Sequence, residues 1–474
     1  MASDIQLYNS LTKRLETFKS QEPGKVSLYN CGPTVYKRQH IGNMRRFLFS
    51  DFLRRTLESF GYEVREITNI TDVGHLTQDE INAGEDKIEK EAKAQSVTPA
   101  DITVRQIQLF MTDIKALNIE SAHLYPRATE HIQQMQDMIV TLIEKNHAYE
   151  TAEGVYFDVQ SFPDYGKLSG NTLEKIDPGH RVDVREEKKH PADFALWVKD
   201  DQHLQKWNSP WGVGYPGWHI ECSAMSLAYL PAPIDIHTGG EDNRFPHHEN
   251  EIAQSEAALG VPFAHYWLHN RHLQMGGQKL AKREGQQITL DTIRERGFSP
   301  LAFRLFVFGT HYRTKIDFSW EALAAAQEYL ETIRQLVRLL QEQGVKPGQP
   351  DHQVVEAFRL ALGDDLNTPE ANAVFAEYVR KMNKLLAEGA PSKELEQAYG
   401  TLHAMDTVVG VIGPLEVELG HEDIPVDIQA LATEREQARA EKQFERADAL
   451  RLELETKGYR VEDTSAGPRV IKLQ

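Results

Sequence analysis

A strand pattern, a turn, a long helix and a second strand pattern follow one another near the start of the chain. Residues 25–31 (K-V-S-L-Y-N-C) favour a strand, and Gly32 and Pro33 favour a turn. Residues 44–60 have the apolar spacing of an amphipathic helix, and residues 63–70 (E-V-R-E-I-T-N-I) favour another strand. Strand, helix and strand in this order form a βαβ unit, so the sequence predicts an α/β fold built on a parallel sheet.

The chain has only two cysteines, and they lie far apart. Cys31 ends the first predicted strand, and Cys222 lies in the stretch P-G-W-H-I-E-C-S-A-M. Downstream, His247 and Glu251 follow a proline, which is favoured in the first turn of a helix, and their spacing of four places them on one helix face. Two thiolates, an imidazole and a carboxylate are a ligand set that zinc prefers. The sequence therefore predicts one zinc ion per chain, bound by Cys31, Cys222, His247 and Glu251.

A plainer interpretation of the same residues stays open. Free cysteines are commonly buried as small hydrophobic side chains, and the chain has no C-x-x-C pair that would indicate a metal site by itself. The His247 and Glu251 pair also fits a solvated helix start with favourable N-terminal charge.

Charge and cysteine content restrict the classes of function. The formal net charge of −18 counts against non-specific binding of nucleic acid over the whole surface, although it leaves room for a local basic groove. Two cysteines and a start without a signal-peptide pattern favour a reducing, cytoplasmic location. No apolar run approaches the roughly 18 residues of a membrane span, so no membrane association is expected. The length suggests two to four domains.

The stretch His40-Ile41-Gly42-Asn43 lies at the predicted turn from strand to helix. Free backbone N–H groups and the helix dipole at such a turn suit a phosphate group. As four letters alone, H-I-G-N is also compatible with an ordinary loop.

Several motifs occur in a fixed order along nearly the whole chain. They are C-G-P-T-V-Y with H-I-G-N, then N-I-T-D (69–72), A-D-F-A-L-W, S-P-W-G, G-W-H-I-E-C-S-A-M, F-P-H-H-E-N-E and D-L-N-T-P-E-A. In these motifs the chain resembles the class I aminoacyl-tRNA synthetases in their cysteinyl form. The resemblance implies an ATP-dependent ligase that converts L-cysteine to cysteinyl-adenylate and transfers it to the 3′ end of tRNA-Cys. It also implies that the zinc ion binds the substrate thiolate and so separates cysteine from serine.

The resemblance implies roles for further residues. The catalytic group comprises His40, Asn43, Lys279 and Lys282, ATP binding adds Gly42, and the substrate cysteine is held near Gly32, Thr71 and Trp218. A magnesium ion accompanies ATP. The two lysines lie where the family has its mobile K-M-S-K-S loop, but this chain replaces both hydroxyl residues, by Ala281 and Arg283. Trp218 also fits an ordinary core position.

The implied architecture is a Rossmann-like catalytic domain followed by helical and anticodon-binding parts. The expected boundaries are residues 1–120 and 205–310 for the two catalytic halves, 121–204 for a connective insertion, 311–348 for a stem helix, 349–425 for a helical bundle and 426–474 for a small α+β anticodon-binding piece. The polar stretch from Leu76 to Asp86 departs from the family pattern as a lengthened loop, and a linker is expected from Gly413 to Pro425. The chain is expected to be a monomer.

Two other functions stay open at this point. One is a cysteine ligase that passes the activated cysteine to a small amine; such relatives lack the anticodon-binding region, whereas this chain has residues 351–474. The other is a non-catalytic RNA-binding paralogue, for which the substitutions at Ala281 and Arg283 are the argument.

Overall fold

The structure is a computed structural model that divides into two compact units. It describes residues 5–74, 76–78, 83–171, 173, 187–279, 287–420, 426–441, 443–464 and 467–472. The first unit comprises Met1–Ile333 with Lys346–Gly410, and the second comprises Arg334–Val345 with Val411–Gln474.

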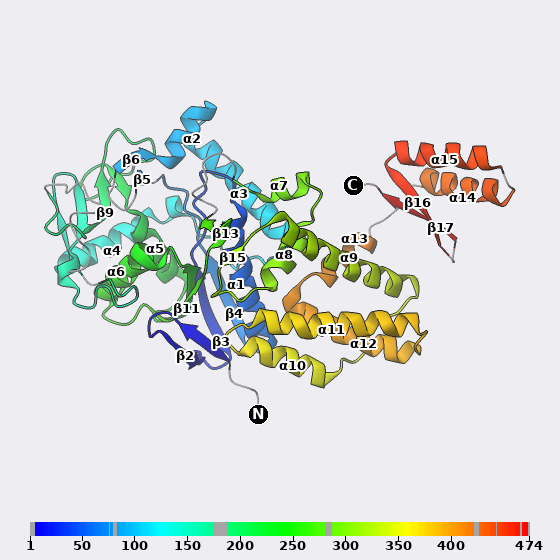
Figure 1. Cartoon of the computed structure of the whole chain (residues 1–474). Coiled ribbons are helices and arrows are strands. Elements are labelled where there is room, and N and C mark those ends of the chain that lie inside the picture. The colour runs from blue at the N-terminus through cyan, green and yellow to red at the C-terminus, as the bar shows by residue number, and fades with distance from the viewer. Residues whose placement is uncertain are drawn as a thin grey trace. The chain divides into compact units, whose positions relative to one another are not determined.

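A four-stranded sheet forms the centre of the first unit (Figure 1). Its order is β12 (Ala264–Asn270), β11 (Ile234–Gly240), β3 (Lys25–Asn30) and β4 (Glu63–Thr68), and each neighbouring pair is parallel. The helix α1 (Ile41–Ser59) connects β3 to β4, as the βαβ pattern predicts. The predicted α/β fold with a parallel sheet is therefore confirmed.

Helix α1 begins three residues before the predicted start at Met44. His40 is its N-cap, and the His40 Nδ1 atom accepts a hydrogen bond from the backbone N–H of Asn43 at 3.2 Å. The same Asn43 N–H also donates to the His40 carbonyl at 2.9 Å, and these two bonds close the first turn over the H-I-G-N stretch itself. Gly42 and Asn43 are consequently helical rather than part of a loop.

The region between the two halves of the central sheet has its own antiparallel sheet and helices. This sheet has the order β10 (Gly214–Pro216), β9 (Phe194–Lys199), β8 (Gly154–Phe157) and β7 (Ala148–Glu150). The helices that pack beside it are α4 (Ile132–Glu144), α5 (Trp218–Tyr229) and α6 (Glu249–Leu259), and all contribute to one apolar core. Strands β7, β8 and β9 lie within the stretch 121–204, which the sequence analysis assigns to a connective insertion.

Other short elements border the central sheet. They are the antiparallel strands β1 (Gln6–Asn9) with β2 (Arg14–Thr17) and β5 (Leu76–Gln78) with β6 (Ala83–Asp86), the helices α2 (Lys87–Gln95), α3 (Pro99–Ala116), α7 (Leu290–Glu295) and α8 (Pro300–Phe308), and a sheet of β14 (Gln278–Lys279), β13 (Leu273–Met275) and β15 (Ile316–Asp317). Part of the predicted loop extension from Leu76 to Asp86 lies outside the described residues, and its two ends pair as β5 and β6.

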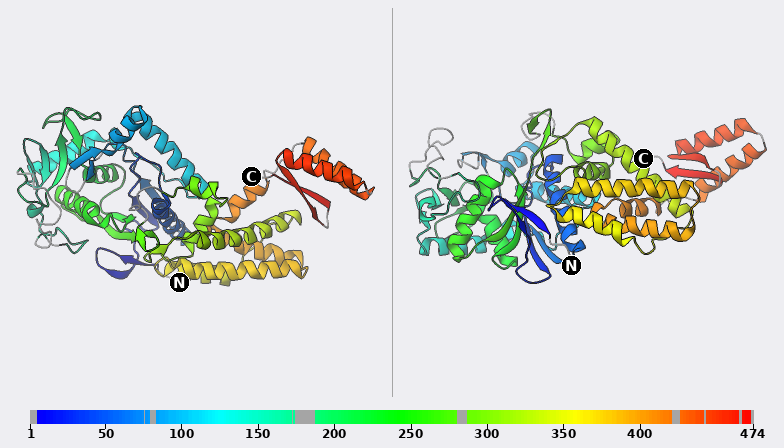
Figure 2. Two further views of the ribbon diagram at one scale, coloured as in Figure 1. Left: turned by 45° about the horizontal axis from the view of Figure 1, so that its top comes forward. Right: turned by 60° about the horizontal axis from the view of Figure 1, so that its bottom comes forward.

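Three helices in the first unit run side by side, as Figure 2 shows: α10 (His352–Gly363), α11 (Thr368–Ala387) and α12 (Ser392–Val409). Asn367 caps α11, because its side-chain oxygen accepts a hydrogen bond from the Glu370 N–H. The buried Arg304 guanidinium of α8 donates to the carbonyls of Val408 and Val409 at the end of α12, and this contact fixes α12 against α8.

The second unit contains α13 (Ile412–Gly420), α14 (Val426–Ala440) and α15 (Phe444–Thr456), followed by the hairpin β16 (Tyr459–Thr464) and β17 (Gly467–Lys472). The long helix α9 (Trp320–Glu342) contributes its residues from Arg334 onward. The apolar core of the second unit includes Ile428, Leu454 and Val461. The linker predicted from Gly413 to Pro425 is wrong up to Gly420, because Gly413 and Pro414 lie in the first turn of α13, where proline is tolerated.

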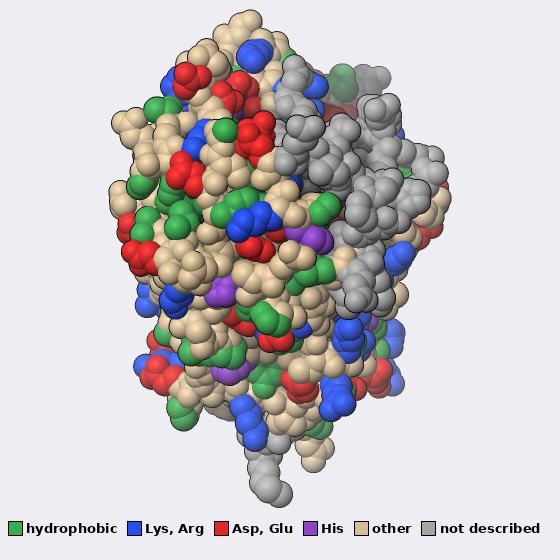
Figure 3. All heavy atoms as spheres, turned by 90° about the vertical axis from the view of Figure 1, so that its left-hand side faces the viewer, with side chains coloured by type: hydrophobic (Ala, Val, Ile, Leu, Met, Phe, Trp, Pro, Cys, Tyr) green, Lys and Arg blue, Asp and Glu red, His purple; other side chains and the backbone are tan. Residues whose placement is uncertain are grey.

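No described helix is long and apolar enough to cross a membrane. Acidic and basic side chains are interspersed on the face that Figure 3 shows. The large negative net charge is therefore not gathered into one patch on this face.

Candidate active site

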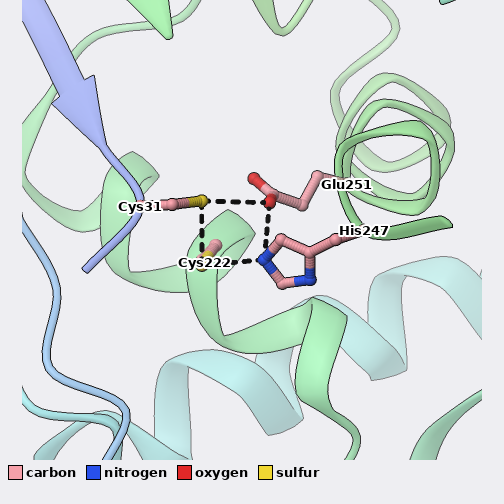
Figure 4. Close-up of side chains that lie close together, drawn as sticks. All are labelled: Cys31, Cys222, His247 and Glu251. Carbon is pink, nitrogen blue, oxygen red and sulfur yellow. Dashed lines mark hydrogen bonds and ion pairs between the residues drawn. The ribbon is translucent and has the colours of Figure 1, made fainter. Parts of the chain in front are cut away.

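The four predicted metal ligands come together from three distant parts of the chain (Figure 4). Cys31 follows the last residue of β3, and Cys222 lies in the second turn of α5. His247 belongs to the turn Arg244–His248, and Glu251 lies in the first turn of α6. The helix α6 begins at Glu249, after His247 rather than at the preceding proline. The two side chains nevertheless converge, and His247 Nε2 lies 2.9 Å from Glu251 Oε1.

The distances between the donor atoms suit one tetrahedral ion. The two sulfurs are 3.9 Å apart, Cys222 Sγ lies 3.4 Å from His247 Nε2, and Cys31 Sγ lies 3.7 Å from Glu251 Oε1. A tetrahedral ion with metal–sulfur bonds of about 2.3 Å separates two sulfur ligands by about 3.8 Å. A disulfide needs about 2.0 Å, so the pair is not arranged as one. The donor set and its spacing therefore fit zinc.

Burial and neighbouring charges set the ionisation of this cluster. Burial raises the pKa of Glu251, but His237 and His247 outweigh it and lower that pKa to about 2. Burial lowers the pKa of His247, but Glu251 and Cys31 raise it to about 10. Burial opposes ionisation of Cys31, whereas hydrogen bonds from Cys222 and His247 lower its pKa to about 5. Without an ion, Cys31 and Glu251 therefore carry negative charge. His247 is protonated, and the hydrogen bond with Cys31 and burial raise the pKa of Cys222 well above its usual range, so a cation that binds here displaces a proton from each of these two residues.

A layer of buried histidines surrounds the four residues. His237 Nε2 lies 2.8 Å from Glu251 Oε2, and the Nδ1 atoms of His219 and His247 are 2.8 Å apart. His248 Nε2 lies 3.2 Å from Cys31 Sγ, while its Nδ1 atom bonds His269 at 2.8 Å. Hydrogen-bond partners of this kind orient the residues that bind a metal directly.

His237 and His248 also form an overlapping set of donors. With Cys31 and Glu251 they lie close enough to hold an ion in place of Cys222 and His247. The sequence contains a weak signal for this layer, because His237 and His269 lie in strands with several apolar residues, but that pattern gives no distance to Cys31.

A cavity of about 340 Å³ adjoins the cluster. Cys31, Cys222 and His247 border it, whereas His237 and His248 do not. Trp218 also lines the cavity and stacks on His247, with ring centroids 4.3 Å apart and an angle of 28° between the planes. Trp218 is therefore a cavity wall, and it packs on a candidate metal ligand.

Three of the residues predicted to bind ATP border the same cavity. His40, Gly42 and Asn43 line it at the start of α1. The Asn43 side chain donates to Gln39 Oε1 at 2.7 Å, which fixes its orientation. A Cβ atom on Gly42 would lie 2.9 Å from two atoms of the His40 ring, so the absence of a side chain there lets the imidazole cap the helix.

Gly32 and Thr71 lie beside each other across two strand ends that border the cavity. The Gly32 N–H donates to Asn69 Oδ1 at 2.7 Å, and Asn69 Nδ2 donates to Thr71 Oγ1 at 3.2 Å. The Thr71 N–H donates to the Pro33 carbonyl at 3.0 Å. These bonds hold the segment after Cys31 against the end of β4.

Replacing Gly32 by alanine is expected to disturb the cluster through the backbone. The added Cβ would lie 1.4 Å from the Asn69 carbonyl oxygen, so the segment after Cys31 has to move. We expect a loss of bound metal and a free energy of unfolding lowered by about 3 kcal/mol. Metal analysis and urea denaturation measure the two effects. Gly413→Ala is the matched control, because nothing lies within 4 Å of its Cβ position and its φ is not positive; metal loss in that variant alone would contradict the account.

The predicted lysines are placed only in part. The backbone of Lys279 belongs to β14, next to the cavity-lining Leu273 of β13, and Lys282 lies outside the described residues.

Arg45 of α1 holds the segments that precede β13 and β15 in place. Its guanidinium donates to the carbonyls of Arg271, His272 and Thr314 at 2.6 to 2.8 Å. This role could not be predicted from the sequence, since Arg45 stands next to Arg46 in a helix with several arginines.

The sequence matches three protein-family models. They are a class I tRNA synthetase (C) catalytic domain at residues 17–328, a DALR domain at residues 357–413 and a cysteinyl-tRNA ligase anticodon-binding domain at residues 421–468.

Full-length relatives and solved structures are similar as well. The cysteine–tRNA ligase of Thermus thermophilus is 41% identical over 98% of both chains. That of Deinococcus radiodurans is 41% identical over 98% of this chain and 96% of the relative, and that of Carboxydothermus hydrogenoformans is 42% identical over 98% and 99%. Methionyl-tRNA synthetase of Mycobacterium tuberculosis in complex with methionyl-adenylate shares the fold, with a TM-score of 0.54, 13% identity and coverage of 84% of this chain and 92% of that one.

Proposed function

The chain belongs to the cysteinyl-tRNA synthetases, a family of class I aminoacyl-tRNA synthetases, and from this premise we propose how its cavity activates cysteine. The activity is that of an ATP-dependent cysteine–tRNA ligase, which forms cysteinyl-adenylate and transfers the cysteinyl group to the 3′ end of tRNA-Cys. The observation that carries the proposal is one cavity bordered by both the cysteine pair and the H-I-G-N turn.

The proposed metal is one zinc ion per chain, held by Cys31, Cys222, His247 and Glu251. Two features favour this set over the one with His237 and His248. It contains both sulfurs at a tetrahedral spacing, and three of its four members border the cavity in which the substrate lies. When bound there, zinc supplies a strong preference for a thiolate over a hydroxyl group, which distinguishes cysteine from serine although the two differ by one atom.

The protein groups position the substrates around this centre. Trp218 stacks on His247 and forms the wall against which the cysteine side chain packs. Gly32 and Thr71 lie near the end of β4 and are proposed to hold the amino group. Because adenylate formation needs no nucleophile from the protein, the contribution of the chain is orientation and stabilisation of charge.

The ATP end of the cavity is assigned to α1 and the lysine loop. His40, Gly42 and Asn43 present the N-terminus of a helix, where N–H groups and the helix dipole favour phosphate. Lys279 and Lys282 are proposed to bring positive charge to the leaving pyrophosphate, and a magnesium ion is proposed to accompany ATP.

Replacing His40 by asparagine is expected to separate its role as helix cap from its proposed role in catalysis. Asparagine is a good N-cap, so α1 stays intact, but the imidazole that borders the cavity is removed. We expect kcat for cysteine-dependent ATP–pyrophosphate exchange to fall about 100-fold, with the melting temperature little changed. Thr98→Asn changes an exposed helix cap of α3 in the same way and serves as the control. A His40→Asn enzyme with normal exchange kinetics would remove His40 from the catalytic group.

The proposed domain boundaries are residues 1–120 with 205–310, 121–204, 311–348, 349–425 and 426–474. The family models support a catalytic region followed by two smaller regions, and the last is an anticodon-binding domain that implies a tRNA partner. A monomer is proposed. The proposed location is the cytoplasm, where translation uses charged tRNA.

The function is tested by charging total bacterial tRNA with labelled cysteine, ATP and magnesium, with serine as competitor. We expect acid-precipitable label that excess serine does not reduce. Cysteine-dependent pyrophosphate exchange without labelled tRNA would favour the small-amine ligase, and the absence of both reactions would favour the non-catalytic RNA-binding protein.

A further inference from the structure

Arg46 of α1 has no part in the site as assigned so far. It lies one helical turn after Asn43, about 4.5 Å along the helix axis, and it borders the same cavity. Its Nη2 atom donates to the Gly32 carbonyl at 3.0 Å, and its guanidinium carbon lies 4.7 Å from the centre of the Phe47 ring. These two contacts hold the guanidinium in a fixed place between the cysteine pair and the helix start.

The charges around Arg46 call for an anion on its cavity side. Both cysteines and Asp242 are near enough to act on it electrostatically, but no described carboxylate is paired with it in an ion bridge, and its Nε atom has no described hydrogen-bond partner. Arg46 is half-buried, and its Nε atom is shielded from water; leaving such a donor unused is costly unless a partner binds. The partner has to be negatively charged and small enough to enter the cavity.

The substrate amino acid has such a group at the required place. With its sulfur at Cys31, Cys222 and His247, its carboxylate lies two carbons away from the sulfur-bearing carbon, in the direction of the ATP site. Gly32 follows Cys31 directly, and Arg46 is bound to Gly32. We propose that Arg46 binds the carboxylate of the substrate cysteine and aims it at the α-phosphate of ATP. This inference rests on the proposed function of the cavity.

The proposed contact of Arg46 with the substrate carboxylate favours the formation of cysteinyl-adenylate. One carboxylate oxygen forms a bond to the α-phosphorus, the bond from that phosphorus to the bridging oxygen breaks, and pyrophosphate leaves with the electron pair. The reacting groups are both anionic, and three ionised ligands, Cys31, Cys222 and Glu251, would leave one negative charge beside them after the two positive charges of a bound zinc ion are counted. A guanidinium fork offsets this repulsion and fixes the direction of the carboxylate, since its planar donors match two carboxylate oxygens.

The test compares cysteine with cysteamine, which has the same thiol and amine but no carboxylate. Binding of each ligand is followed by the sulfur-to-metal absorption band of the cobalt-substituted protein, which needs no turnover. Arg46→Met is expected to weaken cysteine binding about 10- to 100-fold and to change cysteamine binding less than about threefold. Arg46→Lys keeps the charge but loses the fork, and it is expected to fall between the wild type and Arg46→Met.

Controls separate this proposal from the function of the cavity. Arg14→Met removes the same charge from the exposed strand β2 and is expected to leave both affinities unchanged. Equal weakening of both ligands, or no weakening of either, in Arg46→Met or Arg46→Lys would overturn the carboxylate contact. If Arg46→Met does not bind cobalt, Arg46→Lys alone decides the comparison. Failure of the wild-type protein to bind either ligand would instead contradict the proposed metal centre.

Discussion

A Cys222→Ser enzyme should lose its ability to tell cysteine from serine. The substitution removes one of two sulfurs that lie 3.9 Å apart, and a hydroxyl is a far weaker zinc ligand than a thiolate. Removing a residue that only hydrogen-bonds to a metal ligand typically lowers metal affinity or activity by about 10- to 100-fold. Loss of a ligand itself should therefore reduce kcat/KM for cysteine by at least about 100-fold. The KM for cysteine should rise most, and the margin over serine should narrow. Pyrophosphate exchange with each amino acid measures both quantities.

A control for this experiment lies one turn further along the same helix. Ser226 is buried in α5, and its hydroxyl donates to the Ser223 carbonyl at 3.1 Å, away from the metal ligands. Ser226→Ala also changes a single buried atom, and it is expected to keep both zinc and selectivity. Unchanged cysteine kinetics in Cys222→Ser would refute the role of the metal in reading the substrate thiol.

Removal of Asp51 should cause the largest loss of stability. Asp51 is fully buried in α1, where it binds Arg304 at 2.7 Å and Arg55 at 3.0 Å and accepts the Glu120 N–H at 2.8 Å. Arg304 is itself fully buried. Without the carboxylate, Arg304 keeps a buried positive charge without the group it pairs with, while Arg55 retains Glu120 at 3.2 Å. Breaking a buried ion pair in this way typically costs about 3–5 kcal/mol. Urea denaturation of Asp51→Ala should show a decrease of this size in the free energy of unfolding.

The neighbouring pair of Arg54 and Glu58 provides the comparison. Glu58 is on the same helix, and its Oε1 atom lies 2.9 Å from Arg54 Nε. Unlike that of Asp51, its side chain is 34% exposed. Exposed pairs at this spacing contribute about 0.3–0.5 kcal/mol, so Glu58→Ala should change stability by less than about 1 kcal/mol. Similar losses in Asp51→Ala and Glu58→Ala would mean that the buried network does not stabilise the unit as described.

The grouping of the metal ligands could be predicted because their chemistry is rare in this sequence. Two cysteines and a His–Glu pair spaced by four leave few alternative sets, and the βαβ pattern brings Cys31 to the end of a central strand. The parallel sheet itself follows from alternating strand and helix patterns, which need no knowledge of distant contacts.

The positions that the sequence did not predict depend on tertiary contacts. Arg45 and Arg46 are adjacent and chemically identical, yet one pins the carbonyls near β13 and the other borders the cavity, because neighbouring residues on a helix point in different directions. The partner of Asp51 is Arg304, on a helix far along the chain, and no local pattern links the two. The early start of α1 depends on His40 as a cap, although histidine is not among the strongly preferred cap residues.

The central claim is that the four-residue cluster binds zinc and that the zinc reads the substrate sulfur. X-ray absorption at the zinc edge, on protein purified without added metal, tests it most directly. We predict one zinc per chain with two sulfur neighbours, a rise to three when cysteine is added, and no change with serine. Protein without stoichiometric zinc, or a sulfur number that cysteine leaves unchanged, would contradict the account.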